Sequence, residues 1–596
     1  MRDRGHARDL NTPTENTMTS HFTQYDWIVL IAYFLGTMSI GFYFWRKSRS
    51  IEGFTAASRS LPGWVCGLSI FATYLSSISY LALPGKSFAG NWNPFVFSIS
   101  IPIATWIAVK WFLPYYRASG EVSAYAMLEH RFGVWARLYA SIFYLLTQIA
   151  RMGVVMYLMA LPMAVIFGWD IRLIIIITGI SVTIYSFVGG IIAVIWADAI
   201  QAIVLMAGAL ICLTVMMLGV DGGPATVVTE AYKVGKFSLG ELGVGVSPNG
   251  LLWFDATSAT FMVVLLYGLF INLQNFGIDQ SYIQRYIASE SDAEARRSLW
   301  LAGWLYVPVS AVFFLIGTTL FVYYHSEQNT EDLTQVKQLV AQQRLMQDGI
   351  YPQIETDDSG ESRLAPQYAR QLDELAATLD DTAIGDRVFP HFIAKHLPPG
   401  LTGLLVAAVF AAAMSTVSTS LNSSATLLMS DYYRRFVKPE ASERECMLSL
   451  YVATIVWGIL GTGMALLLVR LTESALDIWW TLSGIFGGGM CGLFLLGMIS
   501  RRAKNPAAIT GVLVGIVTIL WLTIPKSISY LLKQPTDSSA HEFGLRLQES
   551  MTGWLSPFHA FMIPVFGTLT ILLVGLLVSS LAKPVNQTEP TSDDGS

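Results

Sequence analysis

Charged residues are scarce in this sequence. Asp, Glu, Lys and Arg make up only 13% of its 596 residues, whereas about a quarter is usual in soluble proteins. Apolar residues make up 53%, and the mean hydropathy is +0.51. The apolar runs reach the roughly 20 residues that a helix needs to cross a bilayer. Runs such as 172–183 lack the alternation of polar and apolar residues seen in membrane β-strands. The sequence therefore excludes a soluble protein and predicts an all-α polytopic membrane protein.

Cysteines, basic clusters and catalytic motifs are also lacking. The four cysteines are scattered without a C-x-x-C pair, which supports neither a disulfide framework nor a zinc site. Nothing predicts nucleic-acid binding or an obligate protein partner. His130, His391 and His396 stand apart in loops without a nucleophile motif, so we expect neither an enzyme nor a cofactor. Residues 1–26 lack the apolar core of a signal peptide and are expected to form a tail.

Hydropathy predicts about thirteen membrane-spanning helices. The expected spans are 27–45, 62–83, 94–113, 138–168, 172–190, 197–219, 254–275, 299–325, 398–428, 447–470, 476–499, 505–525 and 559–581. Basic residues follow the first, third, seventh, ninth and eleventh spans, Arg285 among them, so the positive-inside rule makes those loops cytoplasmic. The chain is then expected in the inner (plasma) membrane, with its N-terminus outside and its C-terminus in the cytoplasm.

Residues 327–397 form a polar, acidic insert between two spans. We expect two surface helices joined by a flexible turn, on the extracytoplasmic side. The insert is interpreted either as a solvated segment or as a lid that gathers ligand. The rest of the chain divides into an extra helix with its loop (27–61), two transport repeats (62–219 and 254–499), C-terminal helices (500–582) and a tail (583–596).

Each of the two repeats holds five predicted spans. Because five is odd, the second repeat must be inverted relative to the first. Inverted repeats place solute and coupling ions near the middle of the membrane, where the first helix of each repeat is broken. One first helix has the polar run 73–79 followed by Pro84-Gly85, and the other has Gly268, Asn272, Gln274, Asn275 and Gly277. This pattern predicts an alternating-access carrier.

The ninth span carries hydroxyl side chains along one face. Ala412, Ser415, Thr416 and Thr419 recur at i, i+3, i+4 and i+7, with Ser418 at the edge of that face. Small hydroxyls allow close packing between helices. They also supply the oxygen ligands that a hard cation such as sodium needs. Packing and sodium binding both stay open on this pattern alone.

Two charged residues lie within predicted spans. Asp198 stands near the start of the sixth span, where a carboxylate is either functional or extends into cytoplasmic water. Arg151 lies deep in the fourth span. Its guanidinium either binds an anionic ligand or joins helices by pairing with a carbonyl or a carboxylate, and Asp198 is the candidate carboxylate.

Several longer motifs resemble those of one transporter family. They are FATYLSSISYLALPG (71–85), EVSAYAMLEHRFG (121–133), YSFVGGIIAVIWADAIQ (185–201), GIDQSYIQRY (277–286), FPHFIAKHLPPGLTGLLVAAVFAAAMSTVSTSLNS (389–423) and LFLLGMISRRAKNP (493–506). In this order and topology the chain is similar to the sodium/solute symporter family of sodium-coupled sugar, proline, monocarboxylate, iodide and sialic acid carriers. The resemblance runs from 27 to about 525 without the insert. Ala197 departs from it, because the family usually has threonine there.

The resemblance implies a LeuT-type five-plus-five inverted repeat, with one extra N-terminal and two extra C-terminal helices. It also implies a sodium site made by the carbonyls of Ala72, Leu75 and Ala412 with the hydroxyls of Ser415 and Thr416. In some family members a second sodium is held at positions that match Asp198, Ser415, Ser418 and Thr419. The chain therefore has suitable residues for two sodium ions per cycle.

The resemblance also concerns the solute. In sialic acid carriers an arginine matching Arg151 holds the solute carboxylate, with hydroxyls matching Ser76 and Ser79 nearby. Tyr74 is placed in the same predicted solute site. Sugar carriers instead rely on an acidic residue in the span matching 94–113, and this span has none.

Two asparagines match functional positions of sugar carriers. Asn272 corresponds to an asparagine that those carriers use, so a polyol part of the solute is expected to contact it. Asn275 stands where sugar carriers have the tyrosine that gates the inner side, so the gate must differ here.

We therefore predict a secondary active symporter that imports a small organic anion, first a sialic acid or a monocarboxylate, together with sodium. A sodium/sugar cotransporter, an amino-acid carrier and a solute sensor with a transporter fold are the alternatives. Sodium between the second and ninth spans would stabilise the outward-open state that binds solute. The expected partners are the solute, sodium ions and membrane lipid.

Overall fold

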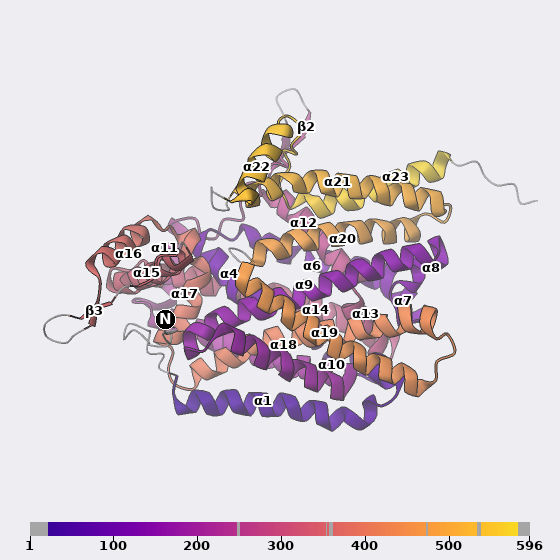
Figure 1. Ribbon diagram of the computed structural model, residues 1–596, viewed down its shortest axis with the longest axis horizontal. Helices are drawn as coiled ribbons and strands as arrows, with labels where there is room; N and C mark the ends of the chain where they lie inside the picture. Colours follow the sequence, from indigo (N-terminus) through magenta and orange to yellow (C-terminus); the bar gives the residue numbers. More distant parts are fainter. Residues whose placement is uncertain are drawn as a thin grey trace, which may run out of the picture.

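Long helices lie side by side and form one bundle, with the acidic insert at one end (Figure 1). The computed structural model describes residues 22–246, 251–347, 349–352, 354–356, 362–471, 475–532 and 538–581. Most of the two predicted tails lies outside these residues. Within them, ten helices are long and apolar enough to cross a membrane, or eleven when one bent pair counts as a span. The all-α membrane fold is confirmed, and the number thirteen stays a prediction.

The helices of the first half are α1 (Gln24–Phe44), α2 (Ile51–Ala56), α3 (Gly63–Tyr74), α4 (Ser77–Ala89), α5 (Val96–Ile99), α6 (Ile101–Ile107), α7 (Leu113–Ser119), α8 (Ala126–Phe132), α9 (Val134–Phe167), α10 (Ile171–Gly219), α11 (Gly223–Lys233), α12 (Phe261–Ile278) and α13 (Gln280–Ala288). Those of the second half are α14 (Asp292–Tyr324), α15 (Thr330–Gln347), α16 (Pro366–Thr378), α17 (Asp381–His396), α18 (Leu401–Leu427), α19 (Glu443–Leu471), α20 (Ala475–Ile499), α21 (Asn505–Leu532), α22 (Ser539–Ser550) and α23 (Met562–Leu581). Two short antiparallel hairpins pair β1 (Val244–Val246) with β2 (Leu252–Phe254), and β3 (Ile354–Thr356) with β4 (Ser362–Leu364).

Helix α10 is too long for a single crossing of the membrane. Its 49 residues, at about 1.5 Å each, exceed the roughly 30 Å of the hydrocarbon core. The helix is kinked at Gly190, where φ is 53° and a Cβ would lie 2.8 Å from the Phe54 ring. Glycine suits both this backbone and this contact. The two parts of α10 correspond to the predicted spans 172–190 and 197–219.

The first helix of the first repeat is broken, as expected. α3 and α4 are bent by 54° relative to each other, and the break lies at Leu75 and Ser76. The Ser76 N–H donates to the Tyr74 carbonyl at 3.1 Å instead of continuing the helical ladder to Ala72. Carbonyl oxygens at the end of α3 therefore lose their helical donors. Pro84 is not the point of interruption, since it lies inside α4.

The first helix of the second repeat is broken as well. α12 ends at Ile278 and α13 begins at Gln280, with Asp279 in an extended conformation between them. The Asp279 side chain accepts a hydrogen bond from the Ser281 N–H at 2.8 Å. Asp279 thus caps α13, because a carboxylate satisfies an N–H group that a helix start leaves unpaired.

Helix α18 lies at the centre of the bundle. All its side chains from 405 to 427 are buried, and it packs against α1, α3, α4, α9, α10 and α19. The N-terminus of α18 is capped by a residue of another helix. The Asp26 carboxylate of α1 accepts hydrogen bonds from the N–H groups of Gly400 (2.8 Å) and Gly403 (2.7 Å). Asp26 therefore fastens the extra N-terminal helix to the helix that carries the predicted sodium hydroxyls.

The acidic insert is only partly a solvated segment. α15 and α16 pack on each other at one end of the molecule, as the two predicted surface helices (Figure 1). α17 instead packs against α4, with Ile384, Val388, Phe389 and Phe392 buried. Its apolar residues repeat at helical spacing, which the overall acidity of the insert concealed. The expectation of a solvated insert is therefore wrong for α17.

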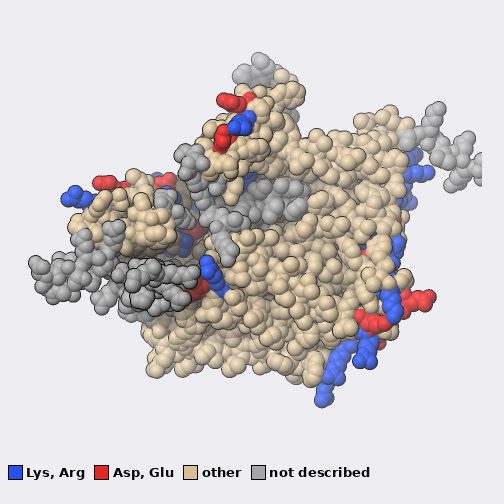
Figure 2. All heavy atoms as spheres, in the orientation of Figure 1, with Lys and Arg blue, Asp and Glu red and all other residues tan. Residues whose placement is uncertain are grey.

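Charge is distributed as a membrane bundle requires. Figure 2 shows a broad face of uncharged side chains, with most of the visible Lys and Arg gathered at the end of the bundle opposite the insert. An uncharged belt between two polar ends suits a protein surrounded by lipid.

Candidate functional site

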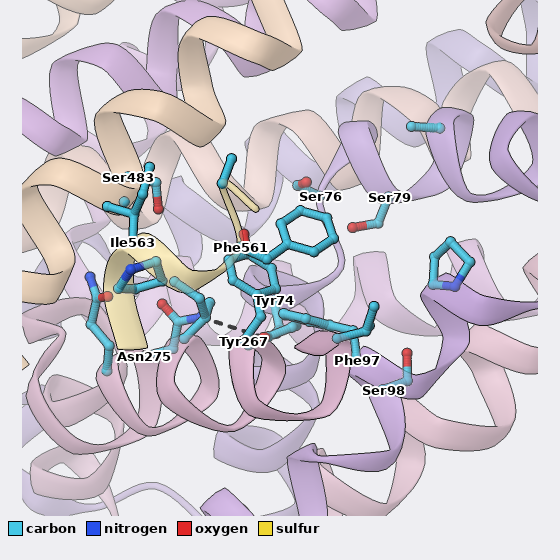
Figure 3. A pocket seen from close by; sticks show the side chains of 18 of the residues that line it. Tyr74, Ser76, Ser79, Phe97, Ser98, Tyr267, Asn275, Ser483, Phe561 and Ile563 are labelled. Carbon is cyan, nitrogen blue, oxygen red and sulfur yellow. Dashed lines mark hydrogen bonds between the residues drawn. The ribbon is translucent and has the colours of Figure 1, made fainter. Parts of the chain in front are cut away.

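A cavity of about 850 Å³ lies beside the two broken helices (Figure 3). It is lined by residues of α3, α4, α9 and α12, by the α12–α13 break, and by the segment 558–564 before and within α23. The Tyr267 and Phe561 rings stack in its wall, with their centroids 4.4 Å apart. Aromatic walls combined with a few polar groups are typical of small-molecule sites.

The cavity gathers most of the residues predicted to bind solute. Tyr74, Ser76, Ser79 and Arg151 all line it, as does the predicted gate residue Asn275. Figure 3 shows Ser79 on α4 and Ser76 just before this helix, with Asn275 on the opposite side of Tyr74. The Asn275 amide donates to the Tyr74 hydroxyl at 3.4 Å. Asn275 is thus one of the polar residues that contact Tyr74 in the cavity.

Asn272 is placed differently from the expectation. It is fully buried behind Tyr74 and does not line the cavity. Its oxygen accepts from the Tyr74 hydroxyl, and its amide donates to the Ser100 hydroxyl at 2.9 Å. Both ends of the side chain are therefore occupied by the protein. In this structure Asn272 orients Tyr74 and does not face the solute cavity.

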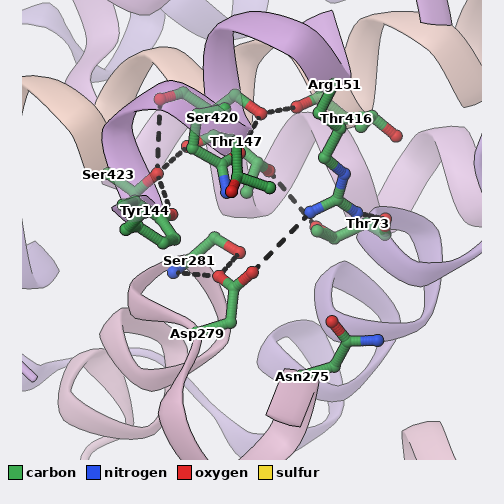
Figure 4. Close-up of polar contacts among 12 residues, drawn as sticks. Thr73, Tyr144, Thr147, Arg151, Asn275, Asp279, Ser281, Thr416, Ser420 and Ser423 are labelled. Atoms are coloured by element: carbon green, nitrogen blue, oxygen red, sulfur yellow. Dashed lines mark hydrogen bonds and ion pairs between the residues drawn. The ribbon is translucent and has the colours of Figure 1, made fainter. Parts of the chain in front are cut away.

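Arg151 extends from α9 toward both helix breaks (Figure 4). Its Nη2 donates to the Thr73 carbonyl at 3.1 Å, at the end of α3. Its Nη1 lies 3.9 Å from Oδ2 of Asp279, in the break between α12 and α13. The expected pairing of Arg151 with Asp198 is wrong, because Asp198 pairs with another arginine. Asp279 was missed, although it is the one carboxylate in the motif 277–286.

Asp198 is fully buried and does not reach water. Its Oδ2 accepts from the Ser69 hydroxyl (2.6 Å) and from Nη2 of Arg285 (2.7 Å). The interpretation of a carboxylate extending into cytoplasmic water is therefore wrong. Arg285 is also fully buried, although the sequence placed it among cytoplasmic basic residues. It lies on α13, which follows the break at Asp279 and packs against α3, α7, α14 and α18.

The same arginine contacts a predicted sodium ligand. Nη2 of Arg285 also donates to the Thr419 hydroxyl at 2.6 Å. Two other polar atoms at the predicted second sodium site, Oδ1 of Asp198 and Oγ of Ser415, are buried and make no hydrogen bond to the described residues. Such unpaired buried oxygens are uncommon and fit a site that takes a cation. The donor set therefore suits sodium on the Oδ1 side of Asp198, with Arg285 on the Oδ2 side.

The predicted first sodium site lies where α3 meets α18. The hydroxyls of Thr73 and Thr419 are 3.2 Å apart across this contact. Thr416 donates its hydroxyl to the Ala412 carbonyl at 3.2 Å, so these two predicted ligands are adjacent. Ala72 and Leu75 stand at the break of α3, on the opposite side of the contact. The structure thus brings the two predicted ligand segments together.

A second polar contact joins α9 to α18, to the left of Arg151 in Figure 4. The Ser420 hydroxyl donates to Oε1 of Gln148 at 2.7 Å, and the Tyr144 hydroxyl donates to the Ser423 hydroxyl at 2.8 Å. These bonds fix α9, and with it Arg151, against the central helix.

The chain is similar to known transporters in sequence. The model of the sodium:solute symporter family matches residues 54–350 and 365–515. The sodium/sialic acid symporter NanT of Aliivibrio fischeri is 30% identical over 564 residues, which cover 94% of this chain and 94% of that protein. SiaT of Proteus mirabilis, also a sodium/sialic acid symporter, is 29% identical and covers 94% of this chain and 96% of its own. The human sodium-coupled monocarboxylate transporter 1 is 26% identical, with 94% of this chain and 87% of that protein covered.

A solved structure shows the same fold. It is described as the substrate-bound outward-open state of a Na+-coupled sialic acid symporter, and it matches with a TM-score of 0.74 at 28% identity, covering 94% of this chain and 99% of that chain. The predicted LeuT-type fold and the prediction of a transporter rather than an enzyme are thereby confirmed. The chain belongs to the sodium:solute symporter family.

Proposed function

We propose that this symporter imports an organic acid of the sialic acid class together with sodium. The observation that carries the proposal is the Arg151 guanidinium, which lines a cavity with aromatic walls beside the hydroxyls of Ser76 and Ser79. A guanidinium pairs with a carboxylate through two parallel hydrogen bonds. Serine hydroxyls suit the polyol part of an acid sugar.

The similarity to two sodium/sialic acid symporters supports this choice. A monocarboxylate is the second candidate, because a monocarboxylate transporter is also similar, at 26% identity. The cavity of about 850 Å³ favours the larger acid, since small ligands bind best when most of their surface is enclosed. A neutral sugar would leave Arg151 without an anionic partner from the solute.

Sodium ions are the coupling ions in this proposal. One would bind the carbonyls of Ala72, Leu75 and Ala412 with the hydroxyls of Ser415 and Thr416, and a second would bind Asp198 with Ser415, Ser418 and Thr419. The unpaired oxygens of Asp198 and Ser415 support the second site. An inward sodium gradient would then favour the solute-binding state on the outer side.

The chain is proposed to lie in the inner (plasma) membrane with its N-terminus outside and its C-terminus in the cytoplasm. The basic side chains gathered at the end opposite the insert support this orientation (Figure 2). Uptake of labelled sialic acids, monocarboxylates and neutral sugars into proteoliposomes tests the function. We expect an acid sugar to enter with an imposed sodium gradient. Equal uptake in potassium buffer without sodium would contradict the coupling.

A further inference from the structure

Arg151 joins the broken helices of both repeats through two different contacts. Nη2 is used by the Thr73 carbonyl, next to the first break, and Nη1 faces Asp279 in the second break (Figure 4). The 3.9 Å between Nη1 and Oδ2 is too long for a hydrogen bond, so this contact is an ion pair that is not fully closed. Each of the two side chains is 12% exposed, and both line the solute cavity.

The two carboxylate oxygens of Asp279 contact different partners. Oδ1 accepts from the Ser281 N–H at 2.8 Å and from the Ser281 hydroxyl, so it is committed to the start of α13. Oδ2 is turned toward Arg151. Among the described residues that line the cavity, Asp279 is the one acidic side chain, beside the cations Arg151, Lys86 and Lys526.

The negative charge of Asp279 affects whether an anion can bind without an accompanying cation. Arg151 and Asp279 together carry no net charge, so a solute carboxylate that takes the place of Oδ2 brings a second negative charge next to Asp279. Two neighbouring carboxylates are unfavourable in a low-dielectric site unless a cation enters with the solute. Without Asp279, the same solute would neutralise Arg151 and would meet no neighbouring negative charge.

We infer that Asp279 is a positioning residue that holds Arg151 in the absence of solute and makes the binding of an organic acid depend on sodium. The solute carboxylate replaces Oδ2 of Asp279 on Arg151, while Oδ1 stays on α13. Solute binding is thereby linked to the second repeat, because the displaced side chain belongs to its break. This inference rests on the proposed anionic solute.

The test is equilibrium binding to the purified full-length protein, at low and at high sodium. The probes are a sialic acid and its methyl ester, which lacks the negative charge. Asp279→Asn removes the charge but keeps a residue that caps helices well. We expect this variant to bind the acid about tenfold more tightly than the wild type at low sodium. The ratio between its dissociation constants at low and high sodium should be smaller than that of the wild type, and its affinity for the ester should not change.

Three further variants separate charge from structure. Ser281→Ala removes a hydrogen bond to Oδ1 and keeps the carboxylate, so it should retain the wild-type sodium dependence. Asp279→Glu, which keeps the charge, should also retain it, whereas Asp279→Ser, a second uncharged cap, should behave like Asp279→Asn. The inference is overturned if Asp279→Asn keeps the wild-type affinity and sodium dependence for the acid, or if it binds the ester equally more tightly.

A further test compares binding of the acid and of the ester to the wild-type protein. Sodium should strengthen binding of the acid more than binding of the ester, and equal strengthening would overturn the inference. Absence of acid binding to the wild type at high sodium would overturn the proposed function and this inference with it. Normal binding to the wild type with an unchanged Asp279→Asn variant would overturn the inference alone.

Discussion

Two arginine–aspartate pairs, Arg285–Asp198 and Arg151–Asp279, differ in closure and in access. Nη2 of Arg285 is 2.7 Å from Oδ2 of Asp198, and both side chains are 0% exposed. Nη1 of Arg151 is 3.9 Å from Oδ2 of Asp279, and both side chains face the cavity. Arg285 also bonds to Ser69 and Thr419, which satisfies more of its donors. The closed pair holds the structure together, whereas the open pair can exchange one partner for a ligand.

The largest effect should come from breaking the closed pair. Arg285→Gln leaves the Asp198 charge buried without its partner, and such a change costs about 3–5 kcal/mol of stability. The melting temperature of the purified protein and its abundance in the membrane should fall together. Arg297→Gln is the matched control, because Arg297 is 76% exposed. Similar melting temperatures for the two variants would show that the closed pair does not stabilise the fold.

Arg151→Lys should affect binding more than stability. An ammonium group keeps the charge but cannot form the two parallel hydrogen bonds of a guanidinium. We expect the affinity for the acid solute to fall by about 2–5 kcal/mol, or roughly 30-fold to several-thousand-fold. The melting temperature should stay near that of the wild type, unlike that of Arg285→Lys. Solute binding and thermal melting measured on both variants test the contrast, and unchanged affinity for every anionic solute would refute it.

A smaller effect is expected when the Ser415 hydroxyl is removed. Ser415→Ala removes a buried oxygen that has no partner among the described residues, so stability should not fall. If Ser415 binds sodium, apparent sodium affinity should fall by about 1–2 kcal/mol. Ser424→Ala is the matched control, since its hydroxyl is also buried and unpaired on α18 but lies outside the predicted sodium set. Equal sodium dependence of uptake in the two variants would exclude Ser415 as a ligand.

The smallest effect concerns a third pair, which lies beyond the membrane-spanning helices. Nε2 of His325 is 3.4 Å from Asp381, at the start of α17, and the hydrogen bond to Asp381 raises the pKa of His325 above 6.5. The stabilising contribution is therefore complete below the unfolded pKa of about 6.5 and is lost as pH rises through the folded pKa.

Because His325 is 35% exposed, this pair should contribute less than about 1 kcal/mol. A small decrease in melting temperature between about pH 6 and pH 9 should disappear in His325→Asn. His130→Asn, at an exposed position of α8, should leave that decrease unchanged. The same decrease in both variants would assign it to other groups.

The sequence was sufficient to predict that the first helix of each repeat is broken. Hydroxyl and amide groups in otherwise apolar spans signal a broken helix, and the resemblance to the family singled out Ser76, Ser79 and Asn275 within those helices. Arg151 stood out because a cation inside a long apolar run needs a partner. These inferences depend on local composition, which a single sequence contains.

The pairing of charges was not predictable in the same way. Asp198 was the candidate carboxylate for Arg151 because both lie in the first repeat, but position along the chain does not determine contact across a bundle. Arg285 was placed in a cytoplasmic loop because it follows an apolar run, but it lies on α13, a helix that is buried along its whole length. Asn272 was expected in the cavity, but it is fully buried and is hydrogen-bonded to Tyr74 and Ser100.

The contact between Asp26 and the start of α18 has a consequence for biogenesis. Asp26 and Gly400 are 374 residues apart in the chain, yet they share a hydrogen bond of 2.8 Å. The N-terminal helix is synthesised early and meets this partner only after most of the bundle has left the ribosome. Nascent chains that end before residue 400 should therefore contain α1 packed on α10 but without its contact to α18, and that contact should form late in assembly.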